Sequence, residues 1–192
     1  MKKCIELAQD LGVRTIQLAG YDVYYEEKSP QTRQRFIKNL RKACDWAEEA
    51  QVVLAIEIMD DPFINSIEKY LAVEKDVDSP YLFVYPDIGN VSAWHNDVYS
   101  EFYLGHHAIT ALHLKDTYAV TESSKGQFRD VPFGQGCVKW EEAFDILKQT
   151  NYNGPFLIEM WSENCETVEE TRAAIQEAQA FLYPLIKKAG LM

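Results

Sequence analysis

The clearest pattern along the chain is a series of short, continuous apolar runs separated by longer segments with helical spacing. Strands of a parallel sheet covered on both faces are continuously apolar, whereas strands with one solvated face alternate. The runs therefore predict five strands of a parallel sheet. They are Thr15–Ala19, Val52–Ile58, Leu82–Tyr85, Ile109–Leu114 and Pro155–Met160.

The segments between these runs repeat apolar residues every three or four positions, as amphipathic helices do. Ser29 and Pro30 form a typical helix start, and Thr167 with Glu170 has the spacing of a capping box. The stretch Asp116–Gly136 is rich in turn residues, so we expect one long irregular loop there. Helices are expected at about 2–12, 30–50, 64–77, 92–106, 139–150 and 166–189.

Regular alternation of strands and helices predicts an α/β fold with right-handed crossovers. Two architectures remain open, an open doubly wound sheet and part of a TIM barrel. No G-x-G-x-x-G follows a strand, which disfavours the dinucleotide-binding form of the first. The 192 residues predict a single domain, 1–192, shorter than the roughly 250 residues of a complete barrel.

Charged or metal-ligating residues interrupt four successive apolar runs near their carboxyl ends. They are Glu57, Asp87, His113 and Glu159. In a barrel these ends face one mouth, where active sites are built. Three carboxylates converging with one imidazole would repel one another unless a cation neutralised them. The pattern therefore predicts one bound divalent ion, with Zn²⁺, Mn²⁺, Co²⁺ and Mg²⁺ all suited to these ligands.

The composition of the chain argues against several classes of binding partner. The chain has 19 Lys and Arg against 30 Asp and Glu, a net charge of −11, which argues against nucleic-acid binding. Glu6 and Asp10 interrupt any signal-peptide core, and no apolar run is long enough to span a membrane. The four cysteines form no C-x-x-C pair, as is usual for free thiols. We therefore expect a cytoplasmic protein without membrane partners.

Several segments resemble one known family. They are TIQLAGYDVYY, LAIEIMD, YPDIGNVSAW, HLKDT, VPFGQG and GPFLIEMWSE. They are similar to the bacterial L-ribulose-5-phosphate (L-xylulose-5-phosphate) 3-epimerases, which belong to the xylose-isomerase-like TIM barrels. The resemblance implies a partial (β/α)8 barrel, strands four to eight with their helices, lacking the first three strands.

The resemblance also implies the chemistry, a metal-dependent 3-epimerisation of a ketopentose 5-phosphate. Glu57 and Glu159 would exchange the C3 proton on opposite faces while also binding the metal, and Asp87 and His113 would be ligands only. The expected partner is thus a small phosphorylated ketose.

Weaker candidates for substrate binding lie next to these residues. Lys115 is expected either to contact the phosphate or to pair with Asp116. Asn90 is expected to bind substrate hydroxyls or to cap a loop, and Gln17 to reach the mouth or to satisfy neighbouring backbone. Trp161 either walls the pocket or packs in the core.

Two other functions stay open. One is an inactive or impaired barrel fragment that still binds metal, and the other is a hexulose-6-phosphate-type aldose–ketose isomerase. Endonuclease action is disfavoured by the net charge of −11. The open edges of the strands at 15–19 and 155–160 predict a homo-oligomer, because exposed strand edges recruit other chains.

Overall fold

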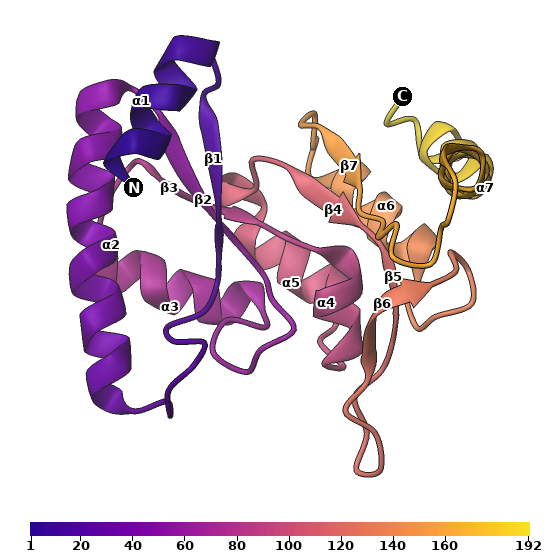
Figure 1. The fold of residues 1–192 in the computed structure, drawn as a ribbon, viewed down its shortest axis with the longest axis horizontal. Helices are drawn as coiled ribbons and strands as arrows, with labels where there is room; N and C mark the ends of the chain where they lie inside the picture. The colour runs from indigo at the N-terminus through magenta and orange to yellow at the C-terminus, as the bar shows by residue number, and fades with distance from the viewer.

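The fold consists of helices that alternate with parallel strands, with one antiparallel hairpin inserted in the second half (Figure 1). The computed structural model describes residues 1–192. Its helices are α1 (Lys2–Leu11), α2 (Pro30–Ala50), α3 (Ile67–Val77), α4 (Ile88–Ala93), α5 (Val98–Gly105), α6 (Trp140–Gln149) and α7 (Val168–Ala189), with a 3-10 turn η1 (His106–Ala108). Its strands are β1 (Thr15–Ala19), β2 (Val53–Glu57), β3 (Leu82–Tyr85), β4 (Leu112–Leu114), β5 (Asp116–Tyr118), β6 (Gln127–Val131) and β7 (Phe156–Ile158).

Five strands correspond to the five predicted apolar runs and lie side by side in the order of the chain. They are β1, β2, β3, β4 and β7. β1, β2 and β3 form a parallel sheet, and β4 pairs with β7 in a second parallel sheet. Two parallel bridges, Val84 with Ile109 and Asp87 with His113, join β3 to the segment that carries β4. The result is a partial barrel in which the carboxyl ends of all five strands lie on one side.

Local sequence explains where the long helices begin. The Ser29 side chain accepts a hydrogen bond from the Thr32 backbone N–H at the start of α2, and the Thr32 hydroxyl accepts one from the Ser29 backbone N–H, completing a capping box. The predicted box of Thr167 and Glu170 likewise starts α7. These two helices match their predicted spans to within two residues because cap and apolar spacing agree.

The single helix predicted at 92–106 is wrong, since α4 ends at Ala93 and α5 begins only at Val98. Asp87 caps α4 and Asp97 caps α5, each through its side chain. His95 between them has a φ of 60°, in the left-handed region that ends a helix. Apolar spacing alone did not reveal this break, because side-chain caps compete locally with helix continuation.

The predicted irregular loop at Asp116–Gly136 instead contains the antiparallel hairpin of β5 and β6. The buried carboxylate of Asp116 accepts hydrogen bonds from the backbone N–H groups of Gly134, Gly136 and Val138. These bonds fold the end of the loop back onto β5. The base of the hairpin therefore lies beside the mouth of the partial barrel, whereas its tip is exposed to solvent.

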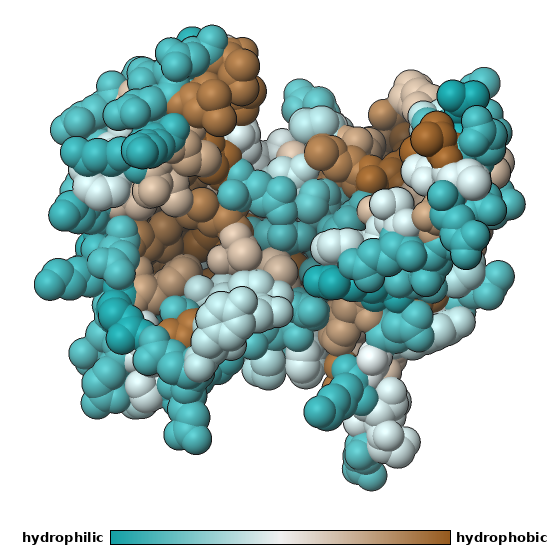
Figure 2. All heavy atoms as spheres, in the orientation of Figure 1, coloured by the Kyte–Doolittle hydropathy of each residue, from teal (hydrophilic) through white to brown (hydrophobic).

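One main hydrophobic core lies between the strands and the helices. It holds 35 buried residues, among them Leu54, Ile56, Leu112 and Phe144. Apolar side chains also line a hollow of about 490 Å³ between α2 and β1, visible as brown atoms in the left half of Figure 2. No helix of the fold has both the length and the apolar character needed to cross a membrane.

Candidate metal centre and active site

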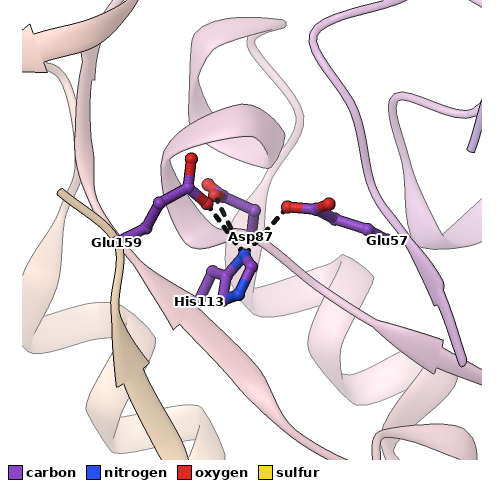
Figure 3. A group of neighbouring side chains, drawn as sticks. All are labelled: Glu57, Asp87, His113 and Glu159. Atoms are coloured by element: carbon purple, nitrogen blue, oxygen red, sulfur yellow. Dashed lines mark hydrogen bonds and ion pairs between the residues drawn. The ribbon is translucent and has the colours of Figure 1, made fainter. Parts of the chain in front are cut away.

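The four ligand-type residues come from four strand ends. Glu57 is the last residue of β2, His113 lies within β4, and Glu159 directly follows β7. Asp87 follows β3 and is also the N-cap of α4. Because the strands are parallel and adjacent, the tertiary structure brings all four side chains to the same edge (Figure 3).

The four side chains converge closely around the imidazole of His113. Its Nδ1 lies 2.8 Å from Glu57 Oε1, 2.8 Å from Glu159 Oε2 and 3.9 Å from Asp87 Oδ2. One ligand atom from each residue lies within 4.8 Å of all the others. In Figure 3, Glu57 and Glu159 reach the cluster from opposite sides. This spacing would allow one ion to contact all four side chains.

Burial and mutual contacts shift the pKa values within the cluster. Burial raises the pKa of Asp87 to about 7, against the attraction of the nearby Lys115. Burial alone would raise the pKa of Glu159, but hydrogen bonds to His113 and Lys115 lower it to about 2. Burial alone would lower the pKa of His113, but bonds to the two glutamates raise it to about 9. The cluster thus favours a positive charge at its centre.

The residues fit a divalent ion. Asp87 Oδ2 is fully buried, points into the cluster and accepts no hydrogen bond, although Lys115 Nζ lies 3.1 Å away. Lys115 gives this oxygen a nearby positive charge, but one ammonium shared with Glu159 does not balance three carboxylates. Carboxylate oxygens with one imidazole nitrogen are ligands for Mn²⁺, Mg²⁺, Co²⁺ and Zn²⁺.

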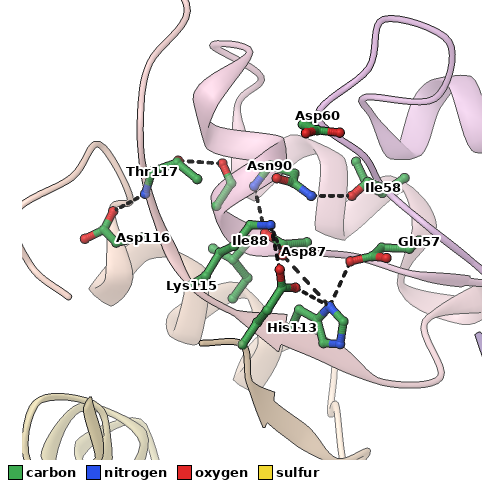
Figure 4. A network of polar contacts seen from close by, with 12 residues as sticks. Glu57, Ile58, Asp60, Asp87, Ile88, Asn90, His113, Lys115, Asp116 and Thr117 are labelled. Carbon is green, nitrogen blue, oxygen red and sulfur yellow. Dashed lines mark hydrogen bonds and ion pairs between the residues drawn. The ribbon is translucent and has the colours of Figure 1, made fainter. Parts of the chain in front are cut away.

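The predicted pairing of Lys115 with Asp116 is wrong. Lys115 instead points into the cluster, where its Nζ lies 3.1 Å from Asp87 Oδ2 and 3.0 Å from Glu159 Oε1 (Figure 4). The carboxylate of Asp116 points away and is occupied by backbone N–H groups. Lys115 is buried and contacts two carboxylates, so its charge is already paired within the site.

The other predicted substrate-binding residues line a cavity of about 390 Å³ over the cluster. Gln17 donates a 2.6 Å hydrogen bond to Glu57 Oε2, so it orients that glutamate. Asn90 donates to the carbonyl of Ile58, and its own Oδ1 is buried without a hydrogen-bond partner. Trp161 lines the cavity as a partly exposed wall rather than packing in the core.

Sequence reasoning missed Arg129, on β6 of the hairpin. Its guanidinium group lies 3.9 Å from the centroid of the Trp161 ring, and both residues line the cavity. Arg129 makes no ion pair, so it is the cation at this mouth whose charge has no carboxylate partner. The only signal in the sequence was the length of the loop that carries it, because long loops in compact domains often bind ligands.

Comparisons with known proteins identify similar chains and a shared fold. SgbU of Haemophilus influenzae is 52% identical over 192 residues, covering 100% of this chain and 66% of SgbU. UlaE of Escherichia coli O157:H7, named as an L-ribulose-5-phosphate 3-epimerase, is 47% identical, covering 100% of this chain and 64% of UlaE. The chain thus spans a little under two thirds of the length of these relatives.

Solved structures share the same architecture. An L-ribulose 3-epimerase has a TM-score of 0.78 at 20% identity, covering 98% of this chain and 66% of that protein. A D-allulose 3-epimerase from Methylomonas sp. has a TM-score of 0.74 at 17% identity, covering 98% and 67%. At these identities the likeness concerns the fold alone. Residues 1–185 also match a family profile, and the chain belongs to the xylose isomerase-like TIM barrel family.

Proposed function

We propose that this site catalyses the 3-epimerisation of a ketopentose 5-phosphate, interconverting L-ribulose 5-phosphate and L-xylulose 5-phosphate. The observation that carries the proposal is the placement of Glu57 and Glu159 on opposite sides of the cluster, with His113 between them (Figure 3). Inversion at a carbon needs one group to remove a proton and another to return one to the opposite face. The name of the relative UlaE supports the choice of substrate.

The chemistry requires an acidic C–H bond next to a carbonyl. One glutamate takes the C3 proton, the substrate becomes an enediolate, and the other glutamate returns a proton to the opposite face. Glu57 and Glu159 exchange these roles when the reaction runs in reverse. Glu57 is oriented for this by Gln17, and Glu159 by His113 and Lys115.

Glu57, Asp87, His113 and Glu159 would hold the divalent ion. When bound, that ion supplies positive charge that polarises the carbonyl and stabilises the negative charge of the enediolate. Asp87 and His113 serve only as ligands in this proposal. The four donor atoms lie within 4.8 Å of one another, which supports a site for a single ion.

Other residues would position the sugar. Asn90 and Trp161 line the cavity, and the face of Trp161 can cover the carbon chain. The 5-phosphate needs a cation, and Lys115 is already held by two carboxylates. We therefore assign phosphate binding to Arg129, whose planar guanidinium matches phosphate oxygens and rests on Trp161.

Proton NMR in D2O tests the proposal directly. The protein with added Mn²⁺ is incubated with L-ribulose 5-phosphate, and the C3 and C1 hydrogens are followed separately. Loss of the C3–H signal with growth of the xylulose epimer is the expected result. Exchange at C1 with formation of an aldose would show an aldose–ketose isomerase instead. No exchange at either carbon, with Mn²⁺ bound, would contradict both enzymes and leave the metal-binding fragment.

A further inference from the structure

Lys115 occupies an unusual position, with its ammonium group inside a cluster that already has the ligands for a divalent ion. Its side chain is 9% exposed and reaches in from the end of β4. The helix α4 leaves room for it, because a Cβ on Gly89 would lie 2.9 Å from Lys115 Cγ and 2.7 Å from its carbonyl oxygen. The surroundings therefore hold this lysine in place from the backbone to the charged tip (Figure 4).

The ammonium group uses oxygens that the metal would also use. Lys115 Nζ lies 3.1 Å from Asp87 Oδ2 and 3.0 Å from Glu159 Oε1. Asp87 Oδ2 has no other polar partner, and Glu159 is otherwise bonded only to His113. A divalent ion bound to these same carboxylates would lie close to the ammonium and be repelled by it.

The net charge of the cluster also indicates that Lys115 and a divalent ion affect each other. When the imidazole of His113 is a neutral metal ligand, the three carboxylates carry three negative charges, and the ammonium of Lys115 leaves two. A divalent ion then brings the buried group to neutrality. Without the lysine, a divalent ion would leave one negative charge behind, and with no ion bound Asp87 Oδ2 would lose the cation 3.1 Å away, which is strongly destabilising.

We propose that Lys115 is a built-in competitor of the divalent ion: it holds Asp87 and Glu159 together when no ion is bound, and it weakens the binding of the ion. This inference rests on the metal site of the proposed function, but it does not depend on epimerase turnover. It assigns Lys115 a positioning role instead of the phosphate contact considered from the sequence.

The test measures Mn²⁺ binding by calorimetry and thermal unfolding in chelator-treated protein. Lys115→Met should bind Mn²⁺ at least tenfold more tightly than the wild type. Its melting temperature in chelator should fall below that of the wild type, and the rise on adding Mn²⁺ should be larger. Lys115→Arg keeps the charge and should stay within threefold of the wild-type Kd. If chelated Lys115→Met does not fold, the protein is refolded with Mn²⁺ and its rate of metal release to excess chelator is compared, with slower release expected.

Lys28→Met is the matched control. Lys28 also bridges two carboxylates, Asp22 and Asp61, but outside the cluster, so its loss should leave the Mn²⁺ Kd unchanged. Equal or weaker Mn²⁺ binding by Lys115→Met, or faster metal release, would overturn the proposal. If the wild type binds no Mn²⁺, a gain of binding in Lys115→Met would support it, and binding by neither would overturn it. Since none of these readouts uses a sugar, a failure of the epimerase reaction is recognised separately.

Discussion

The two halves of the partial barrel, one for each parallel sheet, hold their site residues in different ways. In the half formed by β1, β2 and β3, the residues of β2 are nearly all buried, and Asp87 is fully buried at the start of a helix. In the half formed by β4 and β7, each strand has three residues, and Leu157 in β7 is 44% exposed. Glu159 is held there by His113 and Lys115 rather than by packing. Packing thus fixes β2, β3 and β4, whereas Glu159, on the more exposed β7, is held mainly by charge.

This difference matters for a reaction that uses one glutamate from each half. Glu57 sits at the end of a buried strand and is oriented by Gln17 and His113. The orientation of Glu159 depends on neighbouring positive charges, so we expect it to respond more to the bound ion. Substitutions in the two halves should therefore have different effects.

The first prediction removes each proton-transfer group in turn. Glu57→Gln and Glu159→Gln should each lower the rate of C3–H exchange by about a thousandfold, since general acid–base groups contribute on that scale. NMR in D2O measures the exchange, and electron paramagnetic resonance of added Mn²⁺ reports whether the ion is still bound. Exchange retained in both variants with Mn²⁺ bound would contradict the mechanism with two glutamates.

The second prediction compares packing in the two halves with the same substitution. Leu54→Ala in β2 removes a fully buried side chain and should lower the free energy of unfolding by about 3 kcal/mol. Leu157→Ala in β7 removes a side chain that is 44% exposed and should cost less than about 1 kcal/mol. Urea unfolding of both variants in chelator measures this. Equal losses would show that the β7 half is packed as firmly as the first.

The third prediction concerns the free cation on the hairpin. Arg129→Met should raise the KM for L-ribulose 5-phosphate by about 30-fold, or about 2 kcal/mol, because a charged hydrogen-bond donor is lost. The KM for unphosphorylated L-ribulose should not change. Lys139→Met, which removes an exposed lysine paired with Glu142 outside the mouth, is the control and should leave both values unchanged. A similar rise of KM for both sugars would refute phosphate binding by Arg129.

The fourth prediction tests how the loop after β1 is anchored. The Asp22 side chain is 2% exposed and accepts hydrogen bonds from Lys28 and Thr32. Burial alone would raise the pKa of Asp22, but these two bonds outweigh it and lower the pKa. A carboxyl whose pKa is lower in the folded state stabilises the fold above its unfolded pKa, about 3.9, and loses this contribution as the pH falls through the folded value.

Asp22→Asn should therefore lower the free energy of unfolding by about 1 kcal/mol at pH 7, and by much less near pH 2. Urea unfolding at both pH values measures the difference from the wild type. Glu141→Gln breaks an exposed pair with Lys188 and should have little effect at either pH. A loss for Asp22→Asn that is the same at both pH values would mean that its charge does not anchor the loop.

Local sequence patterns predicted much of the fold. The strand Thr15–Ala19 and the helix α2 have the predicted bounds, because continuous apolar runs and a complete capping box each specify one structure. The split of the predicted helix at 92–106 was missed, since it depends on the side-chain cap of Asp97 and the backbone turn at His95. A side-chain cap acts on only a few residues, whereas the apolar spacing of a helix is judged over several turns. The spacing pattern therefore does not reveal a break of this kind.

The sequence by itself determined the four ligand-type residues and the edge of the sheet on which they lie. Parallel strands place their carboxyl ends together, so the position of Glu57, Asp87, His113 or Glu159 within its run was sufficient. Only the tertiary structure decided where the cations go. Lys115 turned toward Asp87 and Glu159 instead of its neighbour Asp116, and Arg129 came to rest on Trp161 from a distant hairpin. Long flexible side chains reach whichever partner the folded backbone brings near, and no local pattern encodes that choice.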